Sequence, residues 1–203
     1  MSIKAKKEDF KRELIPAGNY VARCYKMIEI GTVPTEFQGV VKMQPKVRIG
    51  WELPTELKVF NEEKGAQPCV IDKEYTLSLG DKSNLRKDLK SWRGKDFTPQ
   101  EADDFDVTTL LGVPCMLNVI HVKGKKDPTQ EYQVIGSVSP LPKGLVCEAQ
   151  VNPNFLFEFD TYDDNKFQSL PEFLRTQIME SEEYIAIHNT EVVATTSHED
   201  LIY

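Results

Sequence analysis

The sequence has no run of apolar residues close to the roughly 20 that a transmembrane helix needs. It begins with MSIKAKKEDFKREL, which is charged and contains no apolar stretch of the kind found in secretory signals. We therefore predict a cytoplasmic protein with no membrane partner.

Patterns typical of catalytic and metal sites are also missing. The sequence contains no Walker loop, GxGxxG or GxSxG motif, and its three histidines fit no metal or triad spacing. The four cysteines are far apart in the sequence: Cys24, Cys69, Cys115 and Cys147. Since each lies in or near an apolar stretch, we expect reduced and mostly buried thiols. These absences predict a protein that is not an enzyme and that uses no cofactor or metal.

Charge is distributed unevenly along the 203 residues. Residues 1–150 carry 23 Lys and Arg against 21 Asp and Glu, a net of +2. Residues 151–203 carry 2 against 11, a net of −9. A chain of this length supports one domain with an appendage. We therefore predict a domain over 1–150 and a C-terminal extension over 151–203.

The most informative segment runs from Glu74 to Gly94 (EYTLSLGDKSNLRKDLKSWRG). Residues 82–95 contain six basic side chains and one acid, a local charge of +5 in a chain whose net charge is −7. Ser83 is a suitable N-cap and Gly94 a suitable stop for a helix between them. Helical periodicity places Trp92 and two leucines on one face of it and basic side chains on an adjacent face. Such concentrated charge indicates an anion-binding surface.

Segments typical of β-strands lie on both sides of this helix. They are 18–32, 41–53, a hairpin over 59–79, 114–123 and 131–139. The order strand, strand, strand or hairpin, helix, strand, strand is that of an oligonucleotide-binding (OB) barrel. We therefore predict a mainly β fold: an OB-fold-like five-stranded barrel with a helix between strands 3 and 4, plus a C-terminal helical, acidic extension.

The segment 41–53 has the clearest two-residue period. Its odd positions are mostly apolar, Val41 and Trp51 among them, and its even positions are polar, Glu52 among them. This alternation predicts one buried face and one cationic face turned outward. Pro45 cannot donate a ladder hydrogen bond, so we expect an edge or a bulge there.

Several segments resemble a family of phage-encoded single-stranded DNA-binding proteins. They are IPAGNY, GWELP, EYTLSLGDKSNLRKDLKSWRGKDFT, LLGVPCMLNVIHV and SPLPKG, and the resemblance extends from Ile15 to Asp160. The resemblance implies an OB-type barrel and a role in phage DNA replication or recombination, in the cytoplasm of the host cell. We therefore expect a sequence-tolerant, single-stranded DNA-binding protein whose DNA-binding domain spans 1–150.

Single-strand binders combine a cationic groove for phosphates with flat side chains on which bases stack. The predicted cations come from three segments and are Lys42, Lys46, Arg48, Lys82, Arg86, Lys87, Lys90, Arg93, Lys95, Lys123, Lys125 and Lys126. Trp51 and Trp92 share a face with apolar residues, so we expect both in the core. The DNA-binding candidates beyond the cation set are Tyr25, Arg23 on the same face, His121 and Tyr132.

Two other classes of function fit the sequence. One is a protein-interaction or scaffold module with a barrel fold, in which the basic helix docks an acidic partner. The other is a metal-dependent nuclease that uses Asp103, Asp104 and Asp106. The setting of these acids, EADDFD between a helix and a strand, is typical of a solvated loop or short helix.

The extension has its own pattern. Residues 154–160 (NFLFEFD) are predicted to form a strand or a docking segment, and Ser169 with Glu172 predicts a capping box that opens an amphipathic helix. The apolar stripe of that helix consists of Leu170, Phe173, Leu174 and Ile178. The stripe packs on the barrel or on a second subunit, and the second alternative predicts a homodimer.

The last residues are the predicted partner-binding site: Glu199, Asp200, Leu201, Ile202 and Tyr203. In the family that the chain resembles, acidic tails with a terminal aromatic recruit polymerases or helicases. The resemblance therefore implies replication or recombination proteins as partners. A second hypothesis is that this tail competes with DNA for the basic groove.

Overall fold

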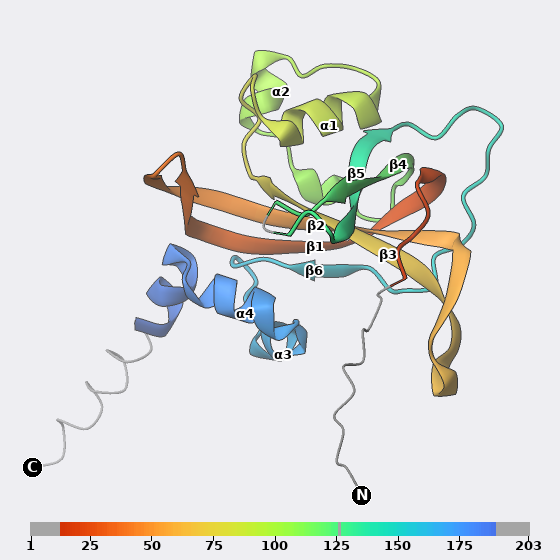
Figure 1. Cartoon of the computed structure of the whole chain (residues 1–203). Helices are drawn as coiled ribbons and strands as arrows, with labels where there is room; N and C mark the ends of the chain where they lie inside the picture. Colours follow the sequence, from red (N-terminus) through yellow and green to blue (C-terminus); the bar gives the residue numbers. More distant parts are fainter. Residues whose placement is uncertain (1–12, 126, 190–203) are drawn as a thin grey trace, which may run out of the picture.

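The computed structural model describes residues 13–125 and 127–189. Its main element is a curled, antiparallel sheet of five strands in the order β3-β2-β1-β4-β5, which forms a half-barrel (Figure 1). The strands are β1 (Gly18–Phe37), β2 (Val40–Asn61), β3 (Gly65–Thr76), β4 (Pro114–Lys123) and β5 (Glu131–Ser139). A short strand, β6 (Phe155–Phe157), pairs in parallel with β1.

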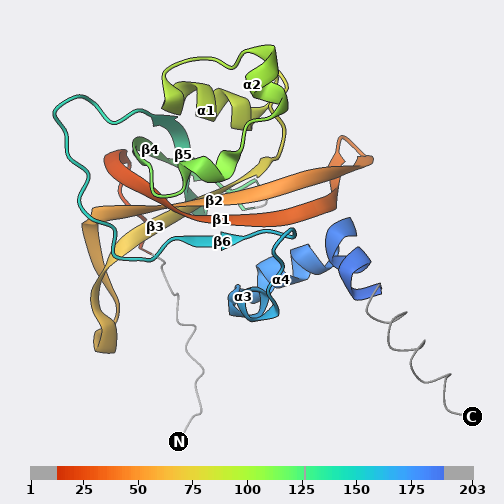
Figure 2. The same ribbon diagram turned by 180° about the vertical axis from the view of Figure 1, so that it is seen from behind.

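Two groups of helices lie on opposite sides of the sheet (Figures 1 and 2). The first group connects β3 to β4 and consists of α1 (Asn84–Arg93), α2 (Pro99–Asp103) and the 3-10 helix η2 (Val107–Leu110). The second group follows β6 and consists of α3 (Asp164–Ser169), α4 (Glu172–Met179) and helical residues 182–189. A 3-10 turn, η1 (Glu62–Lys64), joins β2 to β3. The predicted order of strands and helix is confirmed, and β4 and β5 have the predicted bounds.

The main core lies between the inner face of the half-barrel and α1. Trp51 on β2 and Trp92 on α1 are 1% and 5% exposed, and their ring centroids are 5.9 Å apart. The Ser83 hydroxyl accepts hydrogen bonds from the first backbone N–H groups of α1, and Gly94 ends the helix in a left-handed conformation. The predictions for both tryptophans and for both helix ends are therefore confirmed.

A second core joins the C-terminal extension to the outer face of β1. It contains Ile28 and Ile30 of β1, Phe157 of β6, and Leu174 and Ile178 of α4. The apolar stripe of the extension therefore packs on the sheet of its own chain, which is the first of the two predicted alternatives.

Gly31 allows the extension to approach β1 closely. Its φ is +87°, and a Cβ atom there would lie 2.6 Å from Glu183 Oε2 and from Ser181 Cβ. Any other residue at this position is therefore strained as well as too large. The Glu183 carboxylate accepts hydrogen bonds from the backbone N–H and the hydroxyl of Thr32, both at 2.7 Å.

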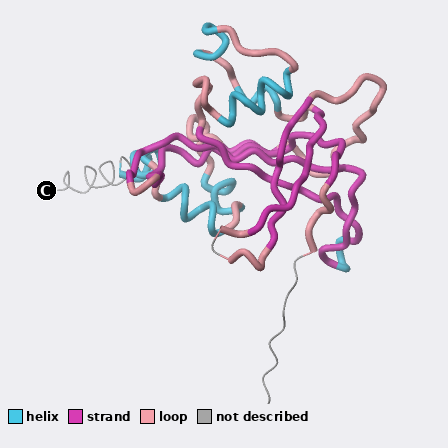
Figure 3. Tube along the Cα trace, turned by 45° about the horizontal axis from the view of Figure 1, so that its top comes forward, coloured by secondary structure: helices cyan, strands magenta, loops and turns pink. Residues whose placement is uncertain are grey.

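Beyond Thr32, β1 and β2 continue as a two-stranded β1–β2 arm (residues 32–37 and 40–45) that extends past the rest of the sheet (Figure 3). Its turn, Gln38 and Gly39, has φ values of 52° and 77°, as a type I′ hairpin turn requires. In this stretch the ladder of β2 is with β1 alone. Pro45 lies where the β3 ladder ends, and its oxygen accepts a hydrogen bond from Leu77 N–H at 2.8 Å, so the missing N–H of Pro45 costs no ladder bond to β3.

Three sequence predictions about individual positions are wrong. Val41, predicted to face the core, is exposed because the β1–β2 arm extends beyond the core. Ser169 ends α3 instead of capping α4, whose N-cap is Pro171 and has no side-chain hydrogen bond. Phe173 is exposed, because the buried side of α4 is formed by Leu174 and Ile178, which are four residues apart.

Glu52 also departs from its prediction. It was expected on the outward face of β2, but it has no exposed surface. The loop before β6 crosses the outer face of the sheet at this point and donates three hydrogen bonds to the carboxylate. In the described part of the chain, no helix is both long and apolar enough to cross a membrane.

Candidate nucleic-acid interface

An open pocket of about 590 Å³ lies where β2 and β3 meet the loop before α1. Its polar lining includes Gln44, Lys46, Glu74, Thr76, Lys82 and Ser83, and we call it the β2–β3 groove. Gln44 and Lys46 come from β2, Glu74 and Thr76 from β3, and the others from the loop. Residues 44–46 of β2 and residues 73–84 of β3 and the following loop thus share one concave polar surface.

Two ammonium groups in the β2–β3 groove have no carboxylate partner. Lys46 Nζ donates to Thr76 Oγ1 at 3.1 Å, and Lys82 is exposed. Among residues 13–125 and 127–189, neither lysine forms an ion pair. Lys42 lies on the same face of β2 as Lys46, four residues earlier, and is also exposed. The charges of these lysines are therefore not neutralised by a direct ion pair, although the carboxylates of Glu74 and Asp81 line the same groove.

A third lysine of the groove, Lys73, serves the fold. Its Nζ lies 2.6 Å from Asp88 Oδ2 on α1 and 3.4 Å from the backbone oxygen of Ile135 on β5. The Tyr75 hydroxyl donates to the same carboxylate at 2.9 Å. Burial raises the pKa of Tyr75, and the neighbouring charge of Asp88 raises it further, so the hydroxyl remains a donor. This network bridges the open side of the half-barrel between β3 and β5.

The basic face of α1 is largely neutralised. Arg86 lies 2.9 Å from Asp81 and 3.3 Å from Asp96, and Lys90 lies 2.7 Å from Asp96. The hydrogen bond from Lys90, with those from the Phe97 N–H and Arg86, lowers the pKa of Asp96 to about 2. The prediction of concentrated free charge along this helix is therefore wrong for these two cations.

The end of the basic segment is neutralised in the same way. Arg93 and Lys95 lie 2.8 Å and 3.1 Å from Glu101 of α2. The backbone N–H of Thr98, with these two cations, lowers the pKa of Glu101 to about 2. Arg93 also stacks over Phe97, 4.1 Å from the ring centroid. Only Lys82 and Lys87 of the predicted set in this segment pair with none of the described carboxylates.

Two further predicted residues serve the fold. The Arg23 guanidinium donates to the backbone oxygens of Gly112, Cys147 and Glu148, and so holds two loops against β1. The prediction that Tyr25 is available for base stacking is wrong, since Tyr25 is buried. The register shifts between Cys24 and Lys26, so the simple alternation of side chains fails there.

Arg48 is the most heavily paired cation of β2. Its Nε lies 3.4 Å from Asp72 Oδ2, and its Nη1 lies 3.8 Å from Glu74 Oε2. Lys26 of β1 adds a second ion pair to Asp72 at 3.0 Å. The predicted cationic outer face of the sheet is therefore, around Arg48, a network of paired charges.

The turn between β4 and β5 carries the remaining candidates. Lys123 and Lys125 are exposed and pair with no described carboxylate, and Tyr132 is also exposed. His121 Nε2 lies 2.8 Å from the backbone oxygen of Ile15, so this ring is used to hold the N-terminal segment. Lys126 and the predicted tail site, Glu199 to Tyr203, lie outside the described residues.

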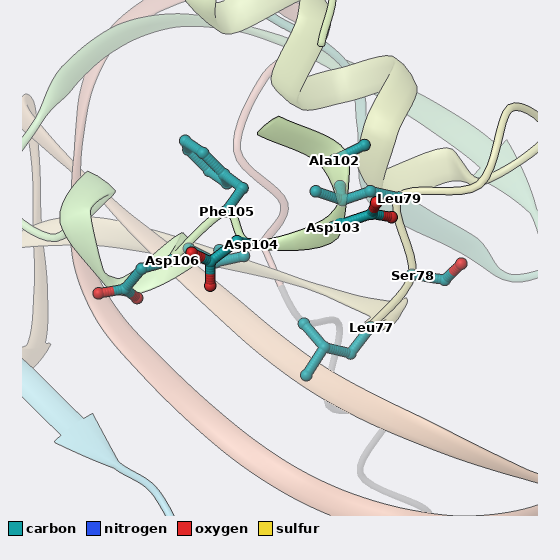
Figure 4. Close-up of a pocket in the computed structure, with 9 residues that line it drawn as sticks. Leu77, Ser78, Leu79, Ala102, Asp103, Asp104, Phe105 and Asp106 are labelled. Carbon is teal, nitrogen blue, oxygen red and sulfur yellow. The ribbon is translucent and has the colours of Figure 1, made fainter. Parts of the chain in front are cut away.

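The acidic cluster lines a shallow pocket of about 320 Å³ below α2 (Figure 4). Asp103 and Asp106 lie toward opposite ends of this pocket, and the Asp106 carboxylate accepts hydrogen bonds from the N–H and hydroxyl of Thr108. Within the described chain, no three His, Cys, Asp or Glu residues are grouped to hold a metal ion. The predicted solvated setting, a short helix and loop, is confirmed for these acids.

Sequence reasoning missed the contact of Lys73, which lines the groove, with Asp88 of α1. Lys73 shares strand parity with Tyr75, and Asp88 is the only charged residue on the apolar face of α1, so the sequence held a signal for their pairing. Phe173 on α4 offered no such signal, because its contact with β2 depends on the docking of the extension. Comparison of the chain with protein-family models, curated proteins and solved structures finds no match.

Proposed function

We propose that this protein binds single-stranded DNA without sequence preference and acts in phage DNA replication or recombination, in the host cytoplasm. The main support is the convergence of Lys46 and Lys82 on the β2–β3 groove, where both lack a described carboxylate partner. Lys42 extends the same face along β2. These lysines bind backbone phosphates, and one or more exposed aromatic side chains stack on bases.

We also propose that the half-barrel is an OB-type barrel. Two observations support this. The strand order β3-β2-β1-β4-β5, with a helix inserted between β3 and β4, is compatible with a five-stranded barrel of this kind. Lys73 spans the gap between β3 and β5, where closure of the barrel is expected.

Fluorescence anisotropy with single- and double-stranded oligonucleotides at two salt concentrations tests the function. Single strands bind more tightly, and the logarithm of affinity falls linearly with the logarithm of salt. Replacing both Lys46 and Lys82 by Ala reduces the magnitude of this negative slope by about 1.4, because each phosphate contact on a single strand contributes about 0.7. The matched control replaces Lys90 and Lys95, which are exposed but paired with Asp96 and Glu101.

Two results contradict the proposal. One is the absence of oligonucleotide binding even at low salt. The other is an equal loss of affinity in the Lys46/Lys82 variant and in the Lys90/Lys95 control, which would show that only the overall charge of the protein matters.

A protein-interaction module remains the second candidate, because two hairpins end in exposed apolar side chains. These are Phe37 and Val41 on the β1–β2 arm, and Leu57 and Phe60 near the β2–β3 turn. Exposed apolar groups gathered on projecting elements are typical of protein contacts. If these hairpin tips contact a protein partner and not DNA, replacing Phe37 and Phe60 by Ser leaves the affinity for oligonucleotides unchanged.

A further inference from the structure

Phe173 is an exposed aromatic on a helix that packs against β1 through other side chains. The side chains of Leu174 and Ile178, on the same helix, are buried against β1, whereas Phe173 is 58% exposed. It is nevertheless held in place, because the Arg48 guanidinium of β2 lies 5.4 Å from its ring centroid. A large apolar ring is thus presented to solvent in a defined position.

Contacts of the described residues connect this ring to the β2–β3 groove. Arg48 lies 3.8 Å from Glu74 Oε2, and Glu74 lines the groove. Gln177, one turn beyond Phe173 on α4, donates to the same carboxylate oxygen at 3.3 Å. The exposed side of α4 is therefore connected to one wall of the groove through Glu74, although α4 belongs to the C-terminal extension and none of its residues lines the pocket.

We propose that Phe173 is a base-stacking residue for single-stranded DNA, and this inference rests on the proposed function. Arg48 is already paired with Asp72 and Glu74, so its role is to support one face of the ring through a cation–π contact. Since Phe173 is 58% exposed, part of its ring is accessible to a nucleobase. Lys46 lies two residues before Arg48, on the same face of β2, and supplies the phosphate contact.

The other exposed aromatics lie at different places. Phe37 and Phe60 are near the tips of hairpins, and Tyr132 lies at the start of β5. Phe173 combines exposure, support by a neutralised cation, and a connection through Arg48 to Glu74, which lines the groove together with Lys46 and Lys82. The extension thereby completes the DNA-binding surface that the domain 1–150 begins.

A Phe173→Trp variant tests the proposal directly. Stacking of a base on tryptophan quenches its fluorescence, and the two native tryptophans, Trp51 and Trp92, are buried and do not meet a ligand. Adding oligo-dT to Phe173→Trp quenches its emission, with the same midpoint as the anisotropy titration. The wild-type protein shows little quenching under the same conditions.

A Phe173→Ala variant gives the energetic readout. Its affinity for oligo-dT falls by about 5- to 100-fold, the range for loss of one stacked base, while its salt slope stays that of wild type. Met179→Ala is the matched control, since Met179 is an exposed apolar residue at the end of the same helix. Thermal unfolding of both variants verifies that the fold is intact.

The outcomes separate this inference from the proposed function. If wild-type protein binds no oligonucleotide, both are overturned. A second case is that the wild-type protein binds and the Lys46/Lys82 variant binds more weakly. If, in that case, Phe173→Trp is not quenched or Phe173→Ala binds as tightly as wild type, only the role of Phe173 is overturned.

Discussion

Glu52 in the middle of β2 accepts a hydrogen bond from Asn152 Nδ2 at 2.6 Å, although 100 residues separate the two in sequence. The same carboxylate accepts from the backbone N–H groups of Val151 and Asn152, both at 2.8 Å. These contacts fix the loop that leads into β6, and so determine where the C-terminal extension meets the sheet.

Replacing Glu52 by Ala is therefore expected to lower the free energy of unfolding by about 3 kcal/mol, because it leaves buried donors without an acceptor. Urea denaturation followed by circular dichroism measures the change. Glu36→Ala, an exposed carboxylate on the β1–β2 arm, is the control and stays within about 0.5 kcal/mol of wild type. Equal stability of the two variants would show that the Glu52 contacts are not maintained in solution.

Asp88 is expected to hold the open side of the half-barrel. An Asp88→Ala variant leaves Lys73 and Tyr75 without their shared acceptor and loses about 2–3 kcal/mol of stability. Hydrogen exchange of the backbone amides of β3 and β5 accelerates in this variant, because α1 no longer bridges them. Asp103→Ala, in the exposed acidic cluster, leaves exchange unchanged. Unaltered exchange in Asp88→Ala would contradict the bridging role.

The pairing around Glu101 predicts a pH dependence. Its pKa is lowered from 4.5 to about 2, so the folded state favours the ionised carboxylate. The resulting stabilisation is fully present above pH 4.5 and is lost as the pH falls toward 2. A Glu101→Gln variant therefore melts at a lower temperature than wild type at pH 7, and the difference disappears near pH 2. A constant difference across this interval would contradict the assignment.

Thiol reactivity is expected to differ among the four cysteines. Burial raises the pKa of Cys24 to about 12 and also raises the pKa of Cys115, so neither forms thiolate near neutral pH. Cys147 is only half-buried. A chromogenic disulfide reagent should therefore modify one thiol rapidly in the folded protein and all four in denaturant. The rapid phase should disappear in Cys147→Ser, and its persistence would contradict the expected order.

The basic segment shows how a charge count along the chain can mislead. Residues 82–95 carry a local +5, but Asp81 and Asp96 lie immediately outside that window. Both pair with Arg86 in the folded chain, and Glu101 on α2 pairs with two more cations. The helix and its caps could be predicted from local sequence, whereas the availability of its charges depended on how the following loop folds back.

The sequence by itself determined which segments form strands, their order along the chain, the capped helix α1 and the buried positions of Trp51 and Trp92. These features follow from two-residue and helical periods and from capping, which act over a few neighbouring residues. The sequence did not determine the ends of β1 and β2, which were predicted at 32 and 53 and lie at Phe37 and Asn61. Only the tertiary structure decided that Glu52 is buried, that Phe173 is exposed over Arg48, and which lysines remain unpaired. Those outcomes depend on contacts between segments 30 to 130 residues apart. A local sequence pattern carries no information about which distant side chain or backbone group a residue will contact.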